Sequence, residues 1–339
     1  MEEFSKALEV KDCEKILELL DDYLHTVERE DQIIELLEKL EDAAVECESY
    51  DLAHEIAHIY AHLNKEEKII EPYKRILEKV KENEEKYIQA LYHLADAYEH
   101  FGFLEEAINA YEELLNLERK RGDETEEALT LAHLALAHEE LEDLEKAIEF
   151  MEQAREKFQK LNDELNYLIS LVDLAHFYYE AGKDEKAEEL IREVLKKPRS
   201  DEIEVNALLV KSEIEAEREN YREAFKDISK AMLKALETDE NLFLFAFETL
   251  QNFLEALFNE KLFEEVYENV DVLVNAFDDV NKDYANFFNA LGELAKLKEG
   301  QEKAKARFEE LYTSIENEEL REILNDFKEK GVKFLNIGL

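Results

Sequence analysis

The 339-residue chain has no tryptophan, two prolines and seven glycines. Because proline and glycine interrupt helices and form tight turns, their scarcity excludes a turn-rich β domain and favours long helices. Two cysteines, Cys13 and Cys47, are too few for a disulfide scaffold, so we expect free thiols in a reducing compartment. The N-terminal MEEFSKALE lacks an apolar signal segment, and no apolar run reaches the length of a membrane span. We therefore expect a cytoplasmic protein.

Basic residues are too few to balance the acidic ones. Lys and Arg number 42 against 87 Asp and Glu, which gives a net charge of −45. This charge argues against general nucleic-acid binding and against docking on an anionic membrane. It favours encounter with basic partners, although acidic side chains also simply solvate helix surfaces. The abundance of Glu and Lys without Trp is typical of thermophile proteins.

A repeating pattern of apolar and small residues runs through the middle of the chain. Residues 87–117 give two amphipathic helices that meet at Gly102, with Ala95 and Ala107 where the helices approach closely. The pattern returns 40 positions later and again 40 positions after that, at Leu134, Ala135, His138, Ala147, Met151 and Ala154, and then at Leu174, Ala175, Tyr178, Gly182, Ala187 and Ile191. A period of this size indicates a solenoid of helical hairpins.

These residues resemble the tetratricopeptide repeat. The resemblance implies an all-α fold, a right-handed α-solenoid of helical hairpins, over roughly residues 49–316 in extended repeats of about 37–42 residues. The expected hairpins are 49–83, 86–120, 125–161, 165–198, 201–237, 240–279 and 281–316. Residues 1–48 and 317–339 are expected to form atypical capping helices, the latter followed by an apolar tail.

Aligned to that repeat, polar and aromatic residues fall on the inner groove. The predicted peptide-binding residues are His54, His58, His62, Tyr92, Asp96, Glu99, His100, Glu139, Glu140, His176, Tyr179 and Glu180, and Glu213, Glu217, Gln251 and Glu255 continue the same face. Carboxylates pair with Lys and Arg, and aromatic faces attract cations, so this groove suits a basic protein segment. A merely solvated surface is the alternative.

The string His54-Glu55-Ile56-Ala57-His58 matches the HExxH pattern, and His62 lies one helical turn further. In zinc proteases the two histidines hold the metal and the glutamate is the general base. The sequence offers no glycine-spaced third histidine and no strand to hold a substrate. We therefore expect ordinary groove residues and no cofactor, with a metal on the three histidines or a metal-dependent hydrolase as alternatives.

An aromatic stretch from Leu242 to Phe263 is apolar on more faces than one helix stripe requires. The residues predicted for self-association or docking are Leu242, Phe243, Phe245, Phe247, Phe253, Phe258, Phe287 and Phe288. A symmetric dimer is the simplest use of such a surface, and a thick core is the alternative.

The resemblance implies a non-catalytic protein–protein interaction scaffold, and the groove composition adds a basic protein partner. One alternative is a translation-linked factor that docks on ribosomal subunits through basic ribosomal proteins, acting by dimerisation or anti-association. The other is the hydrolase at the HExxH string. We expect no membrane partner.

Overall fold

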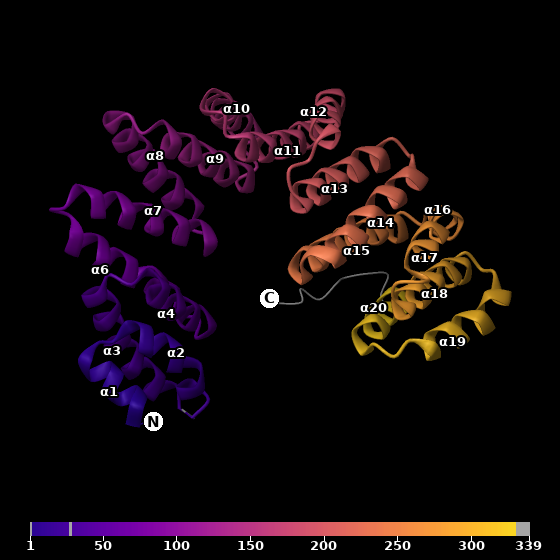
Figure 1. Cartoon of the computed structure of the whole chain (residues 1–339). Coiled ribbons are helices and arrows are strands. Elements are labelled where there is room, and N and C mark those ends of the chain that lie inside the picture. The colour runs from indigo at the N-terminus through magenta and orange to yellow at the C-terminus, as the bar shows by residue number, and fades with distance from the viewer. Residues whose placement is uncertain (1, 27–28, 330–339) are drawn as a thin grey trace. The chain divides into compact units, whose positions relative to one another are not determined.

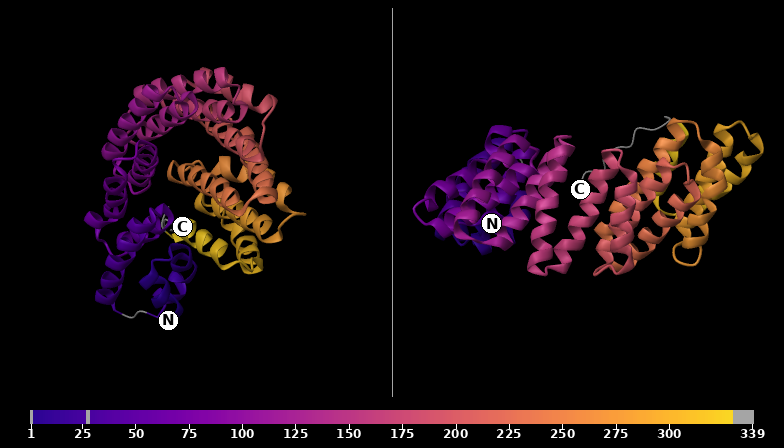
Figure 2. Two further views of the ribbon diagram at one scale, coloured as in Figure 1. Left: turned by 60° about the vertical axis from the view of Figure 1, so that its left-hand side comes forward. Right: turned by 90° about the horizontal axis from the view of Figure 1, so that it is seen from above.

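A computed structural model of the chain describes residues 2–26 and 29–329, and all regular elements in these ranges are helices (Figure 1). The predicted all-α class of helical hairpins in an α-solenoid arrangement is therefore confirmed. The chain is organised as two compact units, Met1–Leu161 and Asn162–Leu339. Figure 2 shows from two further directions that successive helices within each unit lie side by side. No helix in the described ranges combines the length and apolar composition needed to cross a bilayer.

The first unit is built from ten helices in its described residues. They are α1 (Glu2–Val10), α2 (Cys13–Leu24), α3 (Glu30–Cys47), α4 (Tyr50–His62), α5 (Glu66–Ile69), α6 (Glu71–Val80), α7 (Glu84–His100), α8 (Leu104–Arg121), α9 (Glu124–Glu140) and α10 (Leu144–Leu161). Helices α1, α2 and α3 lie within residues 1–48, where the sequence predicts atypical capping helices. Pro72 lies in the first turn of α6, where its missing amide proton costs no hydrogen bond.

The predicted corners between paired helices have left-handed backbone. Gly102 between α7 and α8 has a φ of 76°, and Asn64 after α4 has a φ of 53°. The equivalent corner between α9 and α10 is filled by Glu142, whose φ of 60° is unfavourable for a residue with a Cβ atom. Each corner reverses the chain, so that α7 packs on α8 and α9 packs on α10.

The two cysteines correct one expectation. Cys13, at the start of α2, and Cys47, at the end of α3, form a disulfide, whereas free thiols were predicted. Their Cα atoms lie 6.6 Å apart across 34 residues of sequence. A cysteine count cannot reveal this, because the pairing depends on the packing of α2 against α3.

A buried carboxylate joins three helices of the first unit. Glu41 of α3 accepts a hydrogen bond of 2.6 Å from the Tyr60 hydroxyl of α4 and one of 2.9 Å from the Arg75 guanidinium of α6. Glu41 is buried, so these two partners are what offset the cost of removing its charge from water. The bonds fix how α4 and α6 sit against α3.

The second unit contains ten α-helices and one 3₁₀ turn in its described residues. They are α11 (Glu164–Glu180), α12 (Asp184–Lys196), α13 (Asp201–Glu217), α14 (Tyr221–Thr238), α15 (Glu240–Asn259), α16 (Phe263–Asn269), α17 (Asp271–Phe277), α18 (Lys282–Lys298), η1 (Glu302–Ala304), α19 (Lys305–Ser314) and α20 (Glu318–Glu329). The predicted C-terminal capping helix corresponds to α20. The predicted apolar tail, residues 334–339, lies outside the described residues.

The core of the second unit is rich in phenylalanine. Its buried rings include Phe225 of α14, Phe247 of α15 and Phe277 of α17. Phe287 and Phe288 of α18 have no measurable exposure. Gly292, also on α18, lets the helix approach Val270 so closely that a Cβ atom there would meet Val270 Cγ1 at 2.9 Å. This close approach requires a residue without a side chain at position 292.

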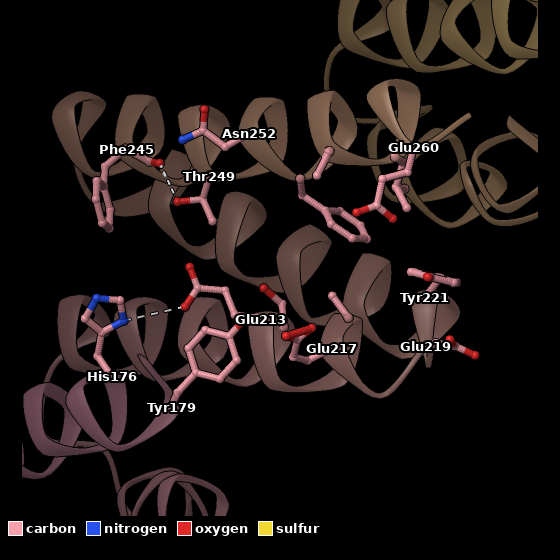
Figure 3. Close-up of a pocket in the computed structure, with 15 residues that line it drawn as sticks. His176, Tyr179, Glu213, Glu217, Glu219, Tyr221, Phe245, Thr249, Asn252 and Glu260 are labelled. Carbon is pink, nitrogen blue, oxygen red and sulfur yellow. Dashed lines mark hydrogen bonds and ion pairs between the residues drawn. The ribbon is translucent and has the colours of Figure 1, made fainter. Parts of the chain in front are cut away.

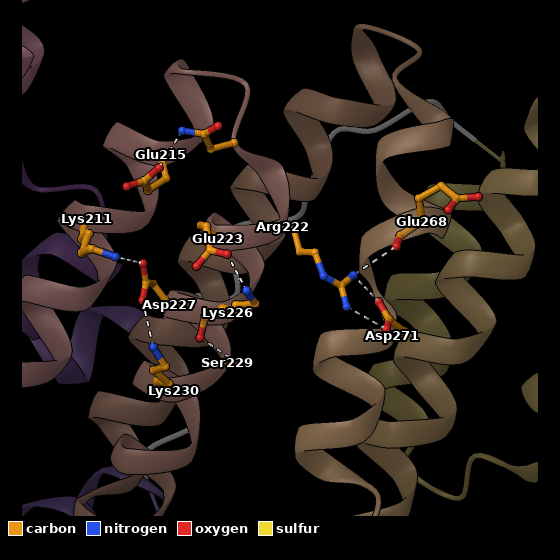
Figure 4. Close-up of polar contacts among 11 residues, drawn as sticks. Lys211, Glu215, Arg222, Glu223, Lys226, Asp227, Ser229, Lys230, Glu268 and Asp271 are labelled. Carbon is orange, nitrogen blue, oxygen red and sulfur yellow. Dashed lines mark hydrogen bonds and ion pairs between the residues drawn. The ribbon is translucent and has the colours of Figure 1, made fainter.

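Polar side chains link α13, α14 and α17 (Figure 4). The buried Asp227 carboxylate of α14 pairs with Lys211 of α13 and lies 3.4 Å from the Lys230 ammonium. The Arg222 guanidinium of α14 donates to both carboxylate oxygens of Asp271, at 3.0 and 3.2 Å. These contacts hold α14 against α13 on one side and α17 on the other.

Candidate functional site

An open pocket lies in the second unit between α11, α13 and α15, where Figure 3 shows side chains from these helices bordering one space. Its volume is about 620 Å³. The lining residues are His176, Tyr179, Ser212, Glu213, Ala216, Glu217, Glu219, Tyr221, Phe245, Thr249, Asn252, Phe253, Ala256, Leu257 and Glu260. Four residues of the predicted groove face, His176, Tyr179, Glu213 and Glu217, line this pocket, and peptide binding there stays a prediction. We call it the acidic pocket.

The acidic pocket has a single sign of fixed charge. Glu213, Glu217, Glu219 and Glu260 line it, and the lining residues in the described part of the chain include no Lys or Arg. Glu217 ends α13 and Glu260 caps the C-terminus of α15. A helix C-terminus already carries a partial negative charge, so each carboxylate there is destabilising by about 0.3–1 kcal/mol. The pocket therefore concentrates negative potential at some cost to stability.

Aromatic rings cover much of the remaining lining. Burial, followed by the charges of Glu213 and Glu217, raises the pKa of Tyr179 to about 12. Burial also raises the pKa of Tyr221, with Glu219 adding to the effect. Both phenols are therefore neutral at physiological pH and can offer their faces to a cation. Phe245, which is 52 % exposed, and the half-buried Phe253 add apolar surface from α15.

His176 of α11 lies among these carboxylates. Its Nδ1 lies 3.7 Å from the Glu213 carboxylate, the pair drawn in Figure 3, and its Nε2 lies 3.6 Å from Glu180. The imidazole therefore lies between two carboxylates, and this arrangement can hold a cation.

The predicted groove residues of α7 form a polar network in the first unit. Glu99 accepts a 2.5 Å hydrogen bond from the Tyr111 hydroxyl and lies 3.6 Å from His133 Nδ1. The ring of Tyr92 meets the His133 ring edge-on at 5.7 Å. Asp96 is exposed. His133 was missed in the sequence, because its contacts come from a neighbouring hairpin.

The end of α9 carries two further predicted groove residues. Glu139 is half-buried and Glu140 is exposed. Burial and the charge of Glu99 raise the pKa of Glu140. These carboxylates extend the acidic character of the face, and their role in peptide binding stays a prediction.

The structure groups the predicted histidines differently from the sequence. Ring nitrogens of His54, His58 and His100 lie within 4.8 Å of one another, whereas His62 contributes no atom to this cluster and is exposed. The Nε2 atom of His58 lies 2.9 Å from that of His54 and 3.3 Å from that of His100. Glu55 is exposed on α4, and we propose no hydrolytic role for it.

Most residues predicted for self-association lie inside the second unit. Phe243, Phe247, Phe258, Phe287 and Phe288 are buried in its core, and Leu242 and Phe253 pack against that core. Phe245 remains exposed and borders the acidic pocket. Self-association stays a prediction. Of these eight residues, Phe245 is the one whose side chain is exposed and could contact a second chain. An apolar run cannot show which of its rings a neighbouring helix will cover.

Comparison with solved structures finds several helical-repeat proteins. The apo form of the quorum sensor NprR from B. thuringiensis is 17 % identical over 96 % of this chain and 90 % of its own, with a TM-score of 0.48. A Rap protein complexed with competence and sporulation factor is 15 % identical over 91 % and 97 %, with a TM-score of 0.48. A signal transduction ATPase with a tetratricopeptide repeat sensor, from Pyrococcus horikoshii, is 21 % identical over 93 % and 48 %, with a TM-score of 0.47. These likenesses say nothing about what this chain binds.

Family profiles match the centre of the chain. Tetratricopeptide repeat profiles match residues 90–125 and 126–199, which span helices from α7 to α12. No curated protein matches the chain. Tetratricopeptide repeats bind protein partners, and proteins built from them are typically non-catalytic scaffolds. The matched profiles and the helical hairpins together identify residues 90–199 as tetratricopeptide repeats.

Proposed function

We propose that the chain is a protein-interaction scaffold whose acidic pocket binds an extended, Lys- and Arg-rich segment of a partner protein. The observation that carries this proposal is the lining of the pocket, which combines four glutamates with Tyr179, Tyr221, Phe245 and Phe253. The net charge of −45 brings basic partners to the chain, and the pocket supplies a place where their side chains can bind.

The carboxylates select the charge of the partner. Glu213 and Glu217 lie one turn apart on α13, so both face the pocket and can each accept a hydrogen bond from a guanidinium or ammonium group. A partner cation would also relieve the repulsion between Glu217 and the C-terminus of its own helix. An acidic segment would meet four like charges and be repelled.

The aromatic rings add a preference for side chains with a flat or apolar part. An arginine between Tyr179 and Phe245 could stack its guanidinium on a ring while pairing with Glu213. Lysine gains less from stacking because its ammonium is compact and strongly hydrated. The proposal therefore includes a preference for Arg-rich over Lys-rich segments.

Fluorescence anisotropy with labelled 12-residue peptides tests the proposal. An Arg-rich peptide is expected to bind more tightly than a Lys-rich one, and a Glu-rich peptide not at all. The double variant Glu213→Gln/Glu217→Gln removes two charges from the pocket, and we expect about 5- to 30-fold weaker binding, the effect of about 1–2 kcal/mol.

A matched control variant distinguishes the effect of losing charge in the pocket from the effect of lowering the total charge of the chain. Glu185 and Glu189 have the same four-residue spacing on α12, are exposed and do not line the pocket. The variant Glu185→Gln/Glu189→Gln loses the same charge and is expected to keep wild-type affinity within about twofold. Equal weakening in both double variants would show diffuse attraction by the whole surface and would overturn the proposal.

A further inference from the structure

Three imidazoles of the first unit converge on one point, independently of the acidic pocket. His54 and His58 lie one turn apart on α4, and His100 ends α7 in the next hairpin. The His58 ring meets the His54 ring edge-on at a centroid distance of 4.4 Å and the His100 ring edge-on at 5.1 Å. The cluster thus draws its members from two helices that residues 63–83 separate along the chain.

Hydrogen bonds alone do not account well for three imidazole nitrogens that lie this close together. A neutral imidazole has one ring nitrogen that accepts and one that donates. The single Nε2 of His58 lies 2.9 Å from His54 Nε2 and 3.3 Å from His100 Nε2, so one lone pair or one N–H would have to serve both neighbours. A cation at the centre accepts a lone pair from each ring at once. Three nitrogens that point at one another are therefore better matched to a metal ion than to protons.

The distances suit a tetrahedral ion. Zinc binds imidazole nitrogen at about 2.0–2.1 Å, which places two nitrogen ligands of a tetrahedral site about 3.3–3.4 Å apart. The separation of 3.3 Å between His58 and His100 fits this value. The 2.9 Å separation between His54 and His58 would widen by about 0.4 Å, which small ring rotations allow.

The surroundings orient the rings. The hydroxyl of the buried Tyr73 lies 3.4 Å from Nδ1 of His54, so an Nδ1–H there can donate to Tyr73 and leave Nε2 free as a ligand. The Phe101 ring packs edge-on against His58 at 5.2 Å and against His100 at 4.7 Å.

We propose that His54, His58 and His100 bind one divalent transition-metal ion of the zinc class, which ties α4 to α7. Imidazole ligands suit zinc, nickel and copper, and exclude magnesium and calcium, which prefer oxygen. With three protein ligands the fourth position is open to water. The ion acts as a cross-link between consecutive hairpins, and the structure assigns it no reaction.

Metal titration of the untagged, chelator-stripped full chain tests the site. Isothermal titration with ZnCl₂ is expected to show one tight equivalent per chain, and Co²⁺ is expected to give the intense visible bands of tetrahedral coordination. Zinc is also expected to raise the melting temperature, because it binds the folded state only. Weaker equivalents on surface carboxylates are expected to remain in all variants.

Four variants locate the binding. His58→Ala and His100→Ala are each expected to weaken the tight equivalent by at least about 100-fold, and Tyr73→Phe by about 10-fold. His62→Ala is the matched control, since it removes an exposed histidine from the same helix, and it is expected to change affinity less than about twofold. Circular dichroism checks that each variant folds, and His100→Ala is decisive if His58→Ala does not fold.

Two results would overturn the site. One is the absence of any tight equivalent in the wild-type chain at pH 7.5. The other is equal loss of zinc affinity in His62→Ala and His100→Ala, because His62 is not part of the proposed site. Neither result bears on peptide binding in the second unit.

Discussion

The Thr130 hydroxyl donates a hydrogen bond of 3.0 Å to the Glu118 carboxylate, and both side chains are buried where α8 packs on α9. Glu118 is 3 % exposed, and its second oxygen, Oε2, has no hydrogen-bond partner among the described residues. Burial, with nearby acidic groups, raises the pKa of Glu118 to about 7, although the Thr130 bond opposes this. The charged form of the Glu118 carboxylate therefore destabilises the first unit.

Glu118 makes stability depend on pH. Its pKa is higher in the folded chain than in the unfolded one, so its stabilising contribution is complete below about pH 4 and declines between about pH 4.5 and pH 7. The variant Glu118→Gln keeps the shape and the bond to Thr130 but cannot ionise. At pH 8 the free energy of unfolding of Glu118→Gln is expected to exceed that of the wild type by up to about 3 kcal/mol. At pH 4.5 the two proteins are expected to be nearly equal in stability. Urea unfolding at both pH values measures the difference.

Glu112→Gln is the control for this prediction. Glu112 lies on the same helix and is exposed, so its replacement is expected to leave the pH dependence of unfolding as in the wild type. Parallel stability curves for the wild type and Glu118→Gln would contradict the assigned pKa.

The corner residues give a prediction about backbone strain. Gly102 has a φ of 76°, and a Cβ atom there would meet nothing within 4 Å, so Gly102→Ala tests strain without steric clash. We expect it to lower the free energy of unfolding by about 1 kcal/mol. The reverse change, Glu142→Gly at the corner between α9 and α10, is expected to raise the free energy of unfolding by up to about 1 kcal/mol. Thermal melts of both variants check the signs, and a neutral Gly102→Ala would contradict the left-handed corner.

The disulfide gives a redox prediction. Cys13 and Cys47 close a loop across 34 residues, for which chain entropy predicts about 2–4 kcal/mol of stabilisation. Cys47→Ser, or reduction of the wild type, is expected to lower the melting temperature of the first unit, and reductant is expected to have no further effect on the variant. Thiol titration of the denatured chain should find none without reductant and two with it. Two free thiols without reductant would restore the prediction made from the sequence.

The hairpins could be predicted from the sequence because each one repeats a local signal. Ala95, Ala107 and Gly102 mark close helix contacts and a corner within 13 residues, so a short window contains the evidence. Lys211 and Ser212 stand where the earlier hairpins have a Leu-Ala pair, such as Leu174-Ala175. In the structure Lys211 pairs with the buried Asp227, and the Ser212 hydroxyl donates to Leu209 O within its own helix. Contacts with other residues thus explain both Lys211 and Ser212, and a pattern read one position at a time does not show such contacts.

Contacts between hairpins could not be predicted in this way. Helical spacing links His54, His58 and His62 on one helix, but the cluster takes His100 from the next hairpin instead of His62. The aromatic run on α15 likewise does not show that α18 covers Phe247 while Phe245 stays exposed. The division of residues 49–316 into seven repeats stays a prediction for the same reason, since hairpin boundaries depend on packing as well as on local pattern.

The central claim is that a basic segment binds in the acidic pocket, and photo-crosslinking tests it most directly. Phe245, 52 % exposed in the pocket lining, and Val280, 55 % exposed on the same unit but not in the lining, are each replaced by p-benzoylphenylalanine. With an Arg-rich peptide, the adduct is expected at position 245 and to disappear when unlabelled peptide competes. Equal labelling at position 280, or none at position 245 under conditions where the peptide is bound, would contradict the account.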